Sequence, residues 1–374
     1  MEAVQSLLLT TVIRRTNERI EELRKAGKVV DSELISEIRE EVLGSVIEEA
    51  NQLAPEFVSY FSEGAARQYK ARRSNEQKVR RSNLKKWGGG FRDFDRLVAA
   101  CDHLLHELGE ATWDWLFAPD GEFSKGVRLL DGPGIGGNGL KAFLFLSMQA
   151  RVCAIASEIR LLAEHGFPDG VRARVRSLYE TVVIMGALTV AEQPNEYEVA
   201  ERYCAWVTVE SKKDQNSIES SFPGSEMRDD EDFAGMEDSA RARWGGNFFK
   251  QHGWALPLFP GKSQVTFADL DRLVGSREMR YWYMHGNHAI HAGPTSVISR
   301  LDFKRTWDPI LSGAEVDRAT VSAMMRIAVH MVEVGSVASC RTLAAITGAY
   351  DFPFALNSIF ECAEKCSDGF AKEA

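Results

Sequence analysis

The chain has 374 residues, of which 44% are hydrophobic and 26% charged, so it holds enough apolar material for one large or two ordinary globular domains. Its formal net charge of −9 at pH 7 excludes a protein that coats nucleic acid or membranes through general positive charge. Six cysteines without a CxxC spacing are typical of reduced thiols rather than of a disulfide framework.

The N-terminus and the longest apolar stretch both bear on location. The first residues lack the basic region and apolar core of a signal peptide. Residues 142–159 are mostly apolar, but Gln149, Arg151 and Glu158 interrupt them, so we expect no membrane span. These features predict a cytoplasmic protein with no membrane partner.

Two amphipathic helices are predicted first, over residues 2–26 and 32–53, from apolar side chains at helical spacing. Gly27 can end the first helix, and Asp31 or Ser32 can cap the second. A helical hairpin cannot bury its apolar stripe alone. We therefore expect it to pack on the body of the protein or on a second copy.

The segment 67–86 is strongly basic, with nine Lys or Arg against one acid. Together with Tyr69 and Trp87 as stacking surfaces, this pattern indicates binding of RNA or another polyphosphate through counterion release. The alternative is a solvated helix that balances the acidic residues of 226–238. The candidate nucleic-acid-binding residues are Arg72, Arg73, Arg80, Arg81, Lys85 and Lys86.

Domain boundaries follow from glycine and from charge. Three glycines at 88–90 predict a hinge that ends an N-terminal region of residues 1–90. A core domain is predicted over 91–350, interrupted by an acidic loop excursion at 221–247, and residues 351–374 form a C-terminal tail. Within the core we expect a loop-like 111–131 region anchored by buried Trp113, Trp115 and Phe117.

Helical periodicity dominates the rest of the core domain. Thr266 can cap a short helix that runs through Leu273. At Gly335 of the last long helix, either a neighbouring helix can approach closely or the helix can bend. No run of residues alternates as a strand would. The prediction is an all-α fold, a multi-helix bundle preceded by an N-terminal helical hairpin. The main helices are predicted near 140–165, 168–192, 195–219 and 314–348.

A glycine-rich loop precedes the first of these helices. Gly132, Gly134 and Gly137 match the spacing G-x-G-x-x-G, but dinucleotide binding needs a strand before the loop and an acid about 20 residues later. The preceding residues make a poor strand. We interpret the loop as a hinge that caps a helix, and we expect no cofactor.

The helix near 168–192 carries charges among apolar residues. Arg176 and Glu180 lie four residues apart, on one helix face with Tyr179 beside them. A charge in a central helix must be paired or functional, so both a structural ion pair and a ligand site fit.

The chemistry-bearing residues are most concentrated in Arg280-Tyr-Trp-Tyr-Met-His285-Gly-Asn-His288-Ala-Ile-His291. Three histidines at steps of three spread over about 120° of a helix face, which is wide for a metal site and needs a carboxylate such as Glu180 to complete it. A hydrogen-bonded packing role at a helix end is the other account of any one histidine. We expect His288 to be structural and no metal to be bound.

Residues 151–188 resemble the core of an uncharacterised, mainly bacterial all-α family known only as domain of unknown function 5677. Its second motif, an aromatic-rich helix that ends in a His before a small-residue turn, is similar to residues 281–296. The resemblance covers about 91–300 and implies a helical fold in which Arg176 and Glu180 are paired with His291. It implies no activity. The matching residues of the first motif are Glu158, Leu161, Leu162, Gly166 and Arg176-Ser-Leu-Tyr-Glu180.

Arg280 and His285 form R-x4-H, which is similar to the signature of HEPN-type helical ribonucleases. The resemblance implies a metal-independent reaction at a composite site of a homodimer, in which the Arg holds the scissile phosphate and the His moves protons to and from the ribose 2′-OH. The chain departs from this signature at Tyr281, where a small polar residue is common, and the other family matches His291 instead of His285.

Two hypotheses follow, with a histidine-based metal site as a further alternative. The first is a metal-independent, HEPN-like endoribonuclease of the toxin or phage-defence kind, acting as a homodimer. The second is a non-catalytic helical module that binds a ligand or partner. The candidate catalytic residues are Arg280, His285, His291, Arg176, Glu180 and Tyr283.

Overall fold

The computed structural model of the protein confirms the all-α prediction, because the residues that it describes lie in helices, turns or connecting loops. The chain divides into two compact units, Met1–Ser74 and Asn75–Ala374. The described residues are 2–118, 137–190, 198–222, 231–275, 280, 283–284, 286, 317–349 and 352–371.

The first unit is the predicted helical hairpin. Helix α1 (Glu2–Lys25) ends before Gly27, which adopts a positive φ of 72°. Helix α2 starts at Ser32, and the side chain of Asp31 accepts a hydrogen bond from the Leu34 amide at 2.9 Å. Apolar residues of both helices are buried, whereas others stay largely exposed. The buried ones are Val12, Ile38 and Val46, and the exposed ones include Ile13, Leu43 and Ile47.

Helix α2 is far longer than predicted, since it runs from Ser32 to Phe117. The expected hinge at 88–90 stays helical, and the helix only kinks at Trp87, where φ is −119° and ψ is 16°. The loop expected from residue 111 is helical as far as Phe117. Trp113 and Phe117 are about half exposed and stack on each other at 5.2 Å, so they are not buried anchors.

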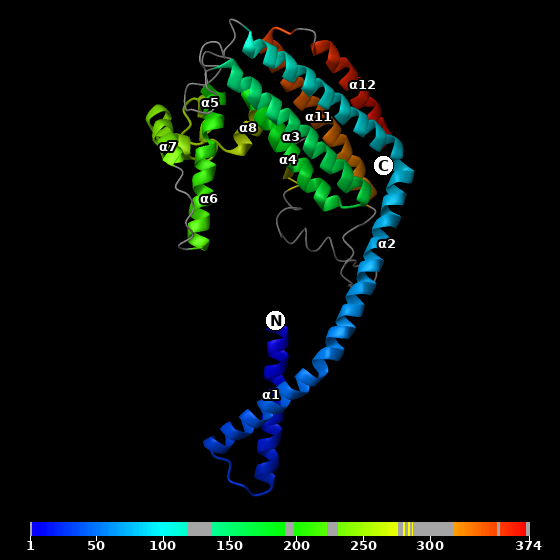
Figure 1. The fold of residues 1–374 in the computed structure, drawn as a ribbon, viewed down its shortest axis with the longest axis vertical. Helices are drawn as coiled ribbons and strands as arrows, with labels where there is room; N and C mark the ends of the chain where they lie inside the picture. The colour runs from blue at the N-terminus through cyan, green and yellow to red at the C-terminus, as the bar shows by residue number, and fades with distance from the viewer. Residues whose placement is uncertain are drawn as a thin grey trace. The chain divides into compact units, whose positions relative to one another are not determined.

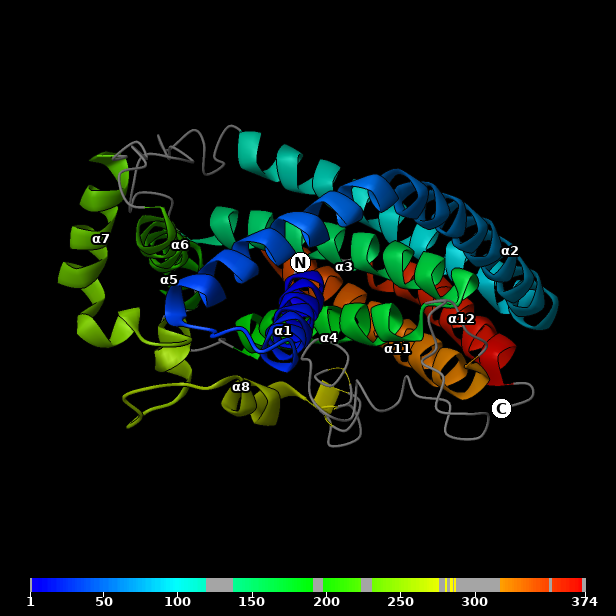
Figure 2. The same ribbon diagram turned by 90° about the horizontal axis from the view of Figure 1, so that it is seen from below.

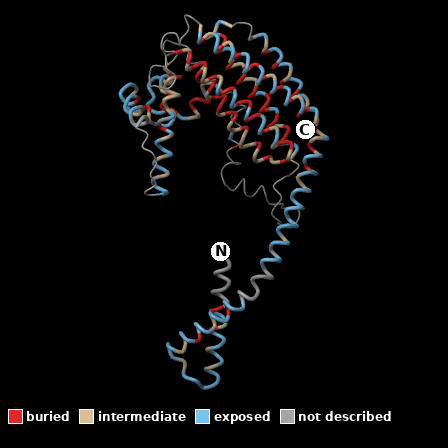
Figure 3. Tube along the Cα trace, in the orientation of Figure 1, coloured by how far each residue is buried: buried red, intermediate tan, exposed pale blue. Residues whose placement is uncertain are grey.

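The second unit is a bundle in which the helices lie side by side (Figure 1). Helix α3 (Asn138–His165) and helix α4 (Pro168–Val190) are joined by a tight turn at Gly166, whose φ is 78°. Helix α11 (Arg318–Thr347) contacts both of them and helix α12 (Phe352–Ala371), so the C-terminal segment belongs to the packed bundle. Burial is concentrated on the facing sides of these helices (Figure 3).

Close backbone approaches set the spacing of the bundle. A Cβ on Gly335 of α11 would lie 3.3 Å from Val152 of α3, as the predicted close contact requires. A Cβ on Gly369 of α12 would lie 2.7 Å from the Cα of Gly90 on α2. The glycines that suggested a hinge therefore include one that admits a neighbouring helix.

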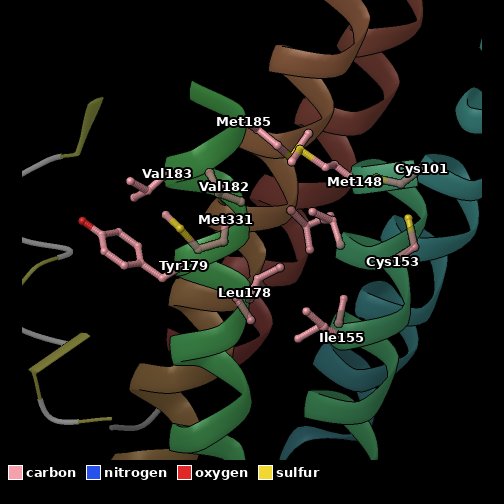
Figure 4. Packing of buried hydrophobic residues seen from close by; sticks show 14 of the residues in the cluster. Cys101, Met148, Cys153, Ile155, Leu178, Tyr179, Val182, Val183, Met185 and Met331 are labelled. Atoms are coloured by element: carbon pink, nitrogen blue, oxygen red, sulfur yellow. The ribbon is translucent and has the colours of Figure 1, made fainter. Parts of the chain in front are cut away.

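Helices α3 and α11 are long and apolar enough to cross a membrane by length and composition. Half of the most apolar window of α3 and two thirds of that of α11 are buried inside the bundle. Core helices of a helical bundle have the same length and composition, and Figure 4 shows their side chains interdigitated with those of α4.

A polar network is buried between α2, α3 and α11. The Gln149 side chain donates to Ser336 Oγ at 3.0 Å and accepts from Ser339 Oγ at 3.1 Å, and all three residues are fully buried. Ser336 also contacts the thiol of Cys101 at 3.3 Å. Burial raises the pKa of Cys101 to about 11, so this thiol stays protonated at neutral pH.

Short helices pack at one end of the bundle (Figure 2). The acidic segment 221–247, expected as a loop excursion, contains α7 (Glu231–Trp244). Its Glu237 accepts hydrogen bonds from Arg241 one turn later and from Lys212 of α6 (Val207–Ser221), which offsets the acidic charge and favours a helix. Thr266 caps α8 (Phe267–Val274) as expected, and Asp269 completes the cap as a capping box that was not predicted. The elements are α5 (Glu198–Ala205), α6 (Val207–Ser221), α7 (Glu231–Trp244), η2 (Gly246–Phe249), η3 (Gly253–Leu258) and α8 (Phe267–Val274).

Candidate functional site

The site is built on α4, which has one apolar and one polar side. Leu178 and Val182 are buried against the bundle, while Arg176 and Glu180 are only partly buried. The Nε group of Arg176 donates to Glu180 Oε1 at 2.9 Å across one helical turn. The predicted pairing of these two residues is present.

Tyr283 joins this pair from a segment 103 residues away. Its hydroxyl donates to Glu180 Oε1 at 3.3 Å and lies 3.5 Å from Nη2 of Arg176. The Arg176 guanidinium also lies over the Tyr283 ring, 5.1 Å from its centroid. A Cβ on Gly286 would lie 2.9 Å from the Cβ of Arg176, so only glycine allows this approach to α4.

A second polar group, formed by Tyr179, Asp271 and Arg280, lies beside the first. The hydroxyl of Tyr179 donates to Asp271 Oδ1, and Nε of Arg280 lies 3.5 Å from Asp271 Oδ2. The Asp271 side chain is 6% exposed, whereas that of Arg280 is 44% exposed. Burial first, and then the hydrogen bond to Asp271, raise the pKa of Tyr179 far above its ordinary value, so Tyr179 acts as a neutral donor.

The Arg176–Glu180–Tyr283 group and the Tyr179–Asp271–Arg280 group are in contact through their tyrosine rings. The Tyr179 and Tyr283 ring centroids are 5.5 Å apart, so the two hydrogen-bonded groups share an aromatic wall. In each group the carboxylate is contacted by the Nε group of an arginine. A guanidinium held at Nε can still direct its Nη groups to a phosphate, although Nη2 of Arg176 also donates to the Tyr283 hydroxyl at 3.5 Å.

Residues 142–306 match a family of unknown function, DUF5677. The match contains most of α3, all of α4 and α8, and Arg280 and Tyr283, so it includes the whole site described above. No curated protein and no solved structure matches the chain.

His252, which sequence reasoning did not select, lies at the edge of the site, because its ring is 6.4 Å from that of Phe267, which in turn is 4.9 Å from that of Tyr283. Burial lowers the pKa of His252, the Glu180 carboxylate opposes that shift, and Lys213 adds to it. His252 is the one described non-glycine residue with a positive φ, of 49°. Asp271 was missed as well, since a single Asp in a short helix gives no sequence signal for a partner 92 residues away.

The histidines of the R-x4-H and DUF5677 motifs, His285 and His291, lie outside the described residues, as does His288. The proposed acid–base role and the metal alternative therefore remain predictions. Among the residues that the structure describes, no three His, Cys, Asp or Glu side chains gather as a metal site.

The basic segment forms part of α2, and its cations differ in their surroundings. Nε of Arg80 lies 2.5 Å from the buried Glu164, so Arg80 serves at least partly to tie α2 to α3. Trp87, expected as a stacking surface, is 2% exposed, and Lys86 lies 5.3 Å from its ring centroid. Tyr69 is exposed. The remaining candidate cations, Arg72, Arg73, Arg81 and Lys85, are exposed too.

Proposed function

We propose that the site on α4 binds the phosphate backbone of RNA and cleaves it without a metal ion. The observation that carries this proposal is the anchoring of Arg176 and Arg280 by Glu180 and Asp271 through Nε, on one face and beside one aromatic wall. Two guanidinium groups fixed in this way suit a phosphate that gains charge in a transition state.

Each residue then has a role. Arg280, whose side chain is the more exposed of the two, holds the scissile phosphate, and Arg176 supports it. Glu180, Asp271 and Tyr283 hold the arginines. His285 or His291 takes the proton from the ribose 2′-OH as its oxygen attacks phosphorus, and a protonated acid gives a proton to the departing 5′-oxygen. The products are a 2′,3′-cyclic phosphate and a free 5′-hydroxyl.

The basic segment, the homodimer and the biological setting predicted from the sequence complete the proposed function. The exposed cations of the basic segment attract the RNA, and a homodimer in the cytoplasm forms the complete site. A toxin or phage-defence role is the biological setting that suits such an activity.

RNA cleavage by the purified protein tests the proposal. Labelled single-stranded RNA is incubated with the parent protein, His285→Ala and His291→Ala, each with and without a chelator. We expect the parent to cleave and at least one variant to lose about 100-fold or more in rate, as loss of a general acid–base group does. Absence of cleavage by the parent, or cleavage by both variants as fast as by the parent, overturns the ribonuclease proposal. Inhibition of the parent by the chelator supports the metal alternative.

A non-catalytic ligand-binding module is the second candidate. Its support is that Arg176 and Arg280 each already face a carboxylate, as arginines of a structural ion pair do. If this candidate is correct, RNA or inorganic phosphate binds to the site but the parent protein cleaves nothing.

A further inference from the structure

A row of four aromatic rings leads away from the site, and we refer to Trp206, His252, Phe267 and Tyr283 as the aromatic strip. The ring centroids of Trp206 and His252 are 6.2 Å apart, and the two ring planes are nearly parallel. His252 and Phe267 are 6.4 Å apart, and Phe267 and Tyr283 are 4.9 Å apart. All four residues are partly exposed, so the strip is not closed within the core.

The strip joins elements that are far apart in the chain. Trp206 lies between α5 and α6, His252 precedes η3, and Phe267 starts α8, which packs on α4. These short helices gather at one end of the bundle (Figure 2). A planar ligand on the strip would thus lie next to Arg176 of α4.

A cationic side chain lies over the ring at each end of the strip. The ammonium group of Lys213 lies 5.0 Å from the Trp206 ring centroid, and the Arg176 guanidinium lies 5.1 Å from that of Tyr283. Lys213 is exposed, and so is nearly half of the Arg280 side chain. Aromatic faces flanked by positive charge suit a chain that carries flat bases on an anionic backbone.

The rings are also held in place. The indole Nε1 of Trp206 donates to the carbonyl of Phe248 at 3.3 Å. His252 keeps a left-handed backbone, which is strained for a non-glycine residue, and at the following Gly253 a Cβ would lie 2.1 Å from the Phe248 carbonyl oxygen. Burial favours the neutral form of His252, which stacks without adding charge.

We infer that the aromatic strip is a stacking subsite for the nucleobases of a single-stranded RNA whose phosphate lies at Arg176 and Arg280. The inference rests on the proposed function for the identity of the substrate and deepens it, because stacking requires unpaired bases. It therefore assigns single strands, with little preference for base identity, as the substrate class.

Binding measured separately from cleavage tests this inference. In this binding test, the parent is the protein that carries both His285→Ala and His291→Ala, so that binding is measured separately from cleavage. Fluorescence anisotropy is measured with an eight-nucleotide uridine RNA and with an abasic oligonucleotide of the same length and charge. In this background we compare Trp206→Leu, Trp206→Phe and His252→Gln. Trp113→Leu removes an exposed ring from α2 and is the matched control.

We expect Trp206→Leu and His252→Gln to weaken RNA binding about tenfold or more, since a stacked aromatic contributes about 1–3 kcal/mol per base. Trp206→Phe should recover most of the affinity, which also shows that the position tolerates substitution. The abasic oligonucleotide should bind all variants alike, and Trp113→Leu should bind like the parent.

Equal binding of RNA and abasic oligonucleotide by the parent overturns the inference, as does an equal loss for both ligands in Trp206→Leu. Absence of RNA binding overturns it too. Base-dependent binding by a protein that cleaves no RNA leaves the stacking subsite intact and removes only the proposed cleavage, so the two failures are distinguishable.

Discussion

The Nε group of Arg176 lies 2.9 Å from Oε1 of Glu180, and this contact decides which side of the guanidinium is available to a ligand. Tyr283 secures the same arrangement, because its hydroxyl also donates to Oε1 of Glu180 and its ring supports the guanidinium. A fixed guanidinium loses little further rotational freedom when it binds a phosphate, which favours binding.

Replacement of Arg176 by lysine keeps the positive charge but removes the fork and the Nε contact to Glu180. If the proposed function holds, we expect RNA cleavage to fall about 100-fold, as it does when a positioned donor is lost from a transition state. Arg174→Lys is the control, because Arg174 pairs with Glu158 of α3 outside the site. Initial rates with labelled RNA measure both, and equal rates for the two variants contradict the assigned role.

The buried network of Gln149 and Ser336 supports a second prediction, on stability. Ser336→Ala leaves the Gln149 amide without its 3.0 Å partner in a fully buried place, so we expect a loss of about 1–3 kcal/mol in the free energy of unfolding. Ser157→Ala, at an exposed residue, removes a hydroxyl that donates within its own helix, at 3.0 Å to Cys153 O, and should change stability by less than about 0.5 kcal/mol. Urea unfolding measures the two, and similar losses would contradict the prediction.

Local signals predicted the ends of several helices. Gly27 ends α1, Asp31 caps α2, and Thr266 caps α8, because each of these effects depends on residues within one turn. The Arg176–Glu180 pair was predictable for the same reason, since i and i+4 positions share a helix face.

The unbroken course of α2 and the remaining members of the site depend on contacts between segments that are distant in the sequence. Residues 88–90 continue α2 because Gly90 receives Gly369 from α12, and no local pattern reveals that partner. Asp271 joins the site through the packing of α8 on α4, and His252 reaches it through the Phe267 ring of α8. A single-sequence pattern has no means of pairing residues some 90 positions apart.

The carboxylate of Asp269 gives the fold a dependence on pH. Lys262 lies 2.6 Å from it and the Thr266 amide donates at 3.0 Å, and these contacts lower the pKa of Asp269 far below its ordinary value. A carboxyl group whose pKa falls on folding adds stability above its unfolded pKa of about 3.9, and the gain is lost as the pH drops below that value.

Asp269→Ala should therefore destabilise the protein by about 1 kcal/mol at pH 7, the usual cost of a lost cap. The difference between variant and parent should shrink as the pH is lowered from 5 to 3, which unfolding curves at several pH values measure. Asp238→Ala, at an exposed position, is the control and should show no such trend. A difference that stays constant over this range would mean that the charge of Asp269 contributes nothing.

The contact between Gly90 and Gly369 separates helix propensity from helix packing. A Cβ on Gly369 would lie 2.7 Å from the Gly90 Cα, and one on Gly90 would lie 3.2 Å from the Phe370 ring, so alanine at either position should cost about 1–3 kcal/mol. Gly89 is exposed with open space around its Cβ position, and Gly89→Ala should stabilise the protein by about 1 kcal/mol. Gly89 and Gly90 are neighbours in one helix, so opposite signs in thermal unfolding identify the α12 contact as the cause. A gain for both substitutions would mean that α2 and α12 do not pack this closely.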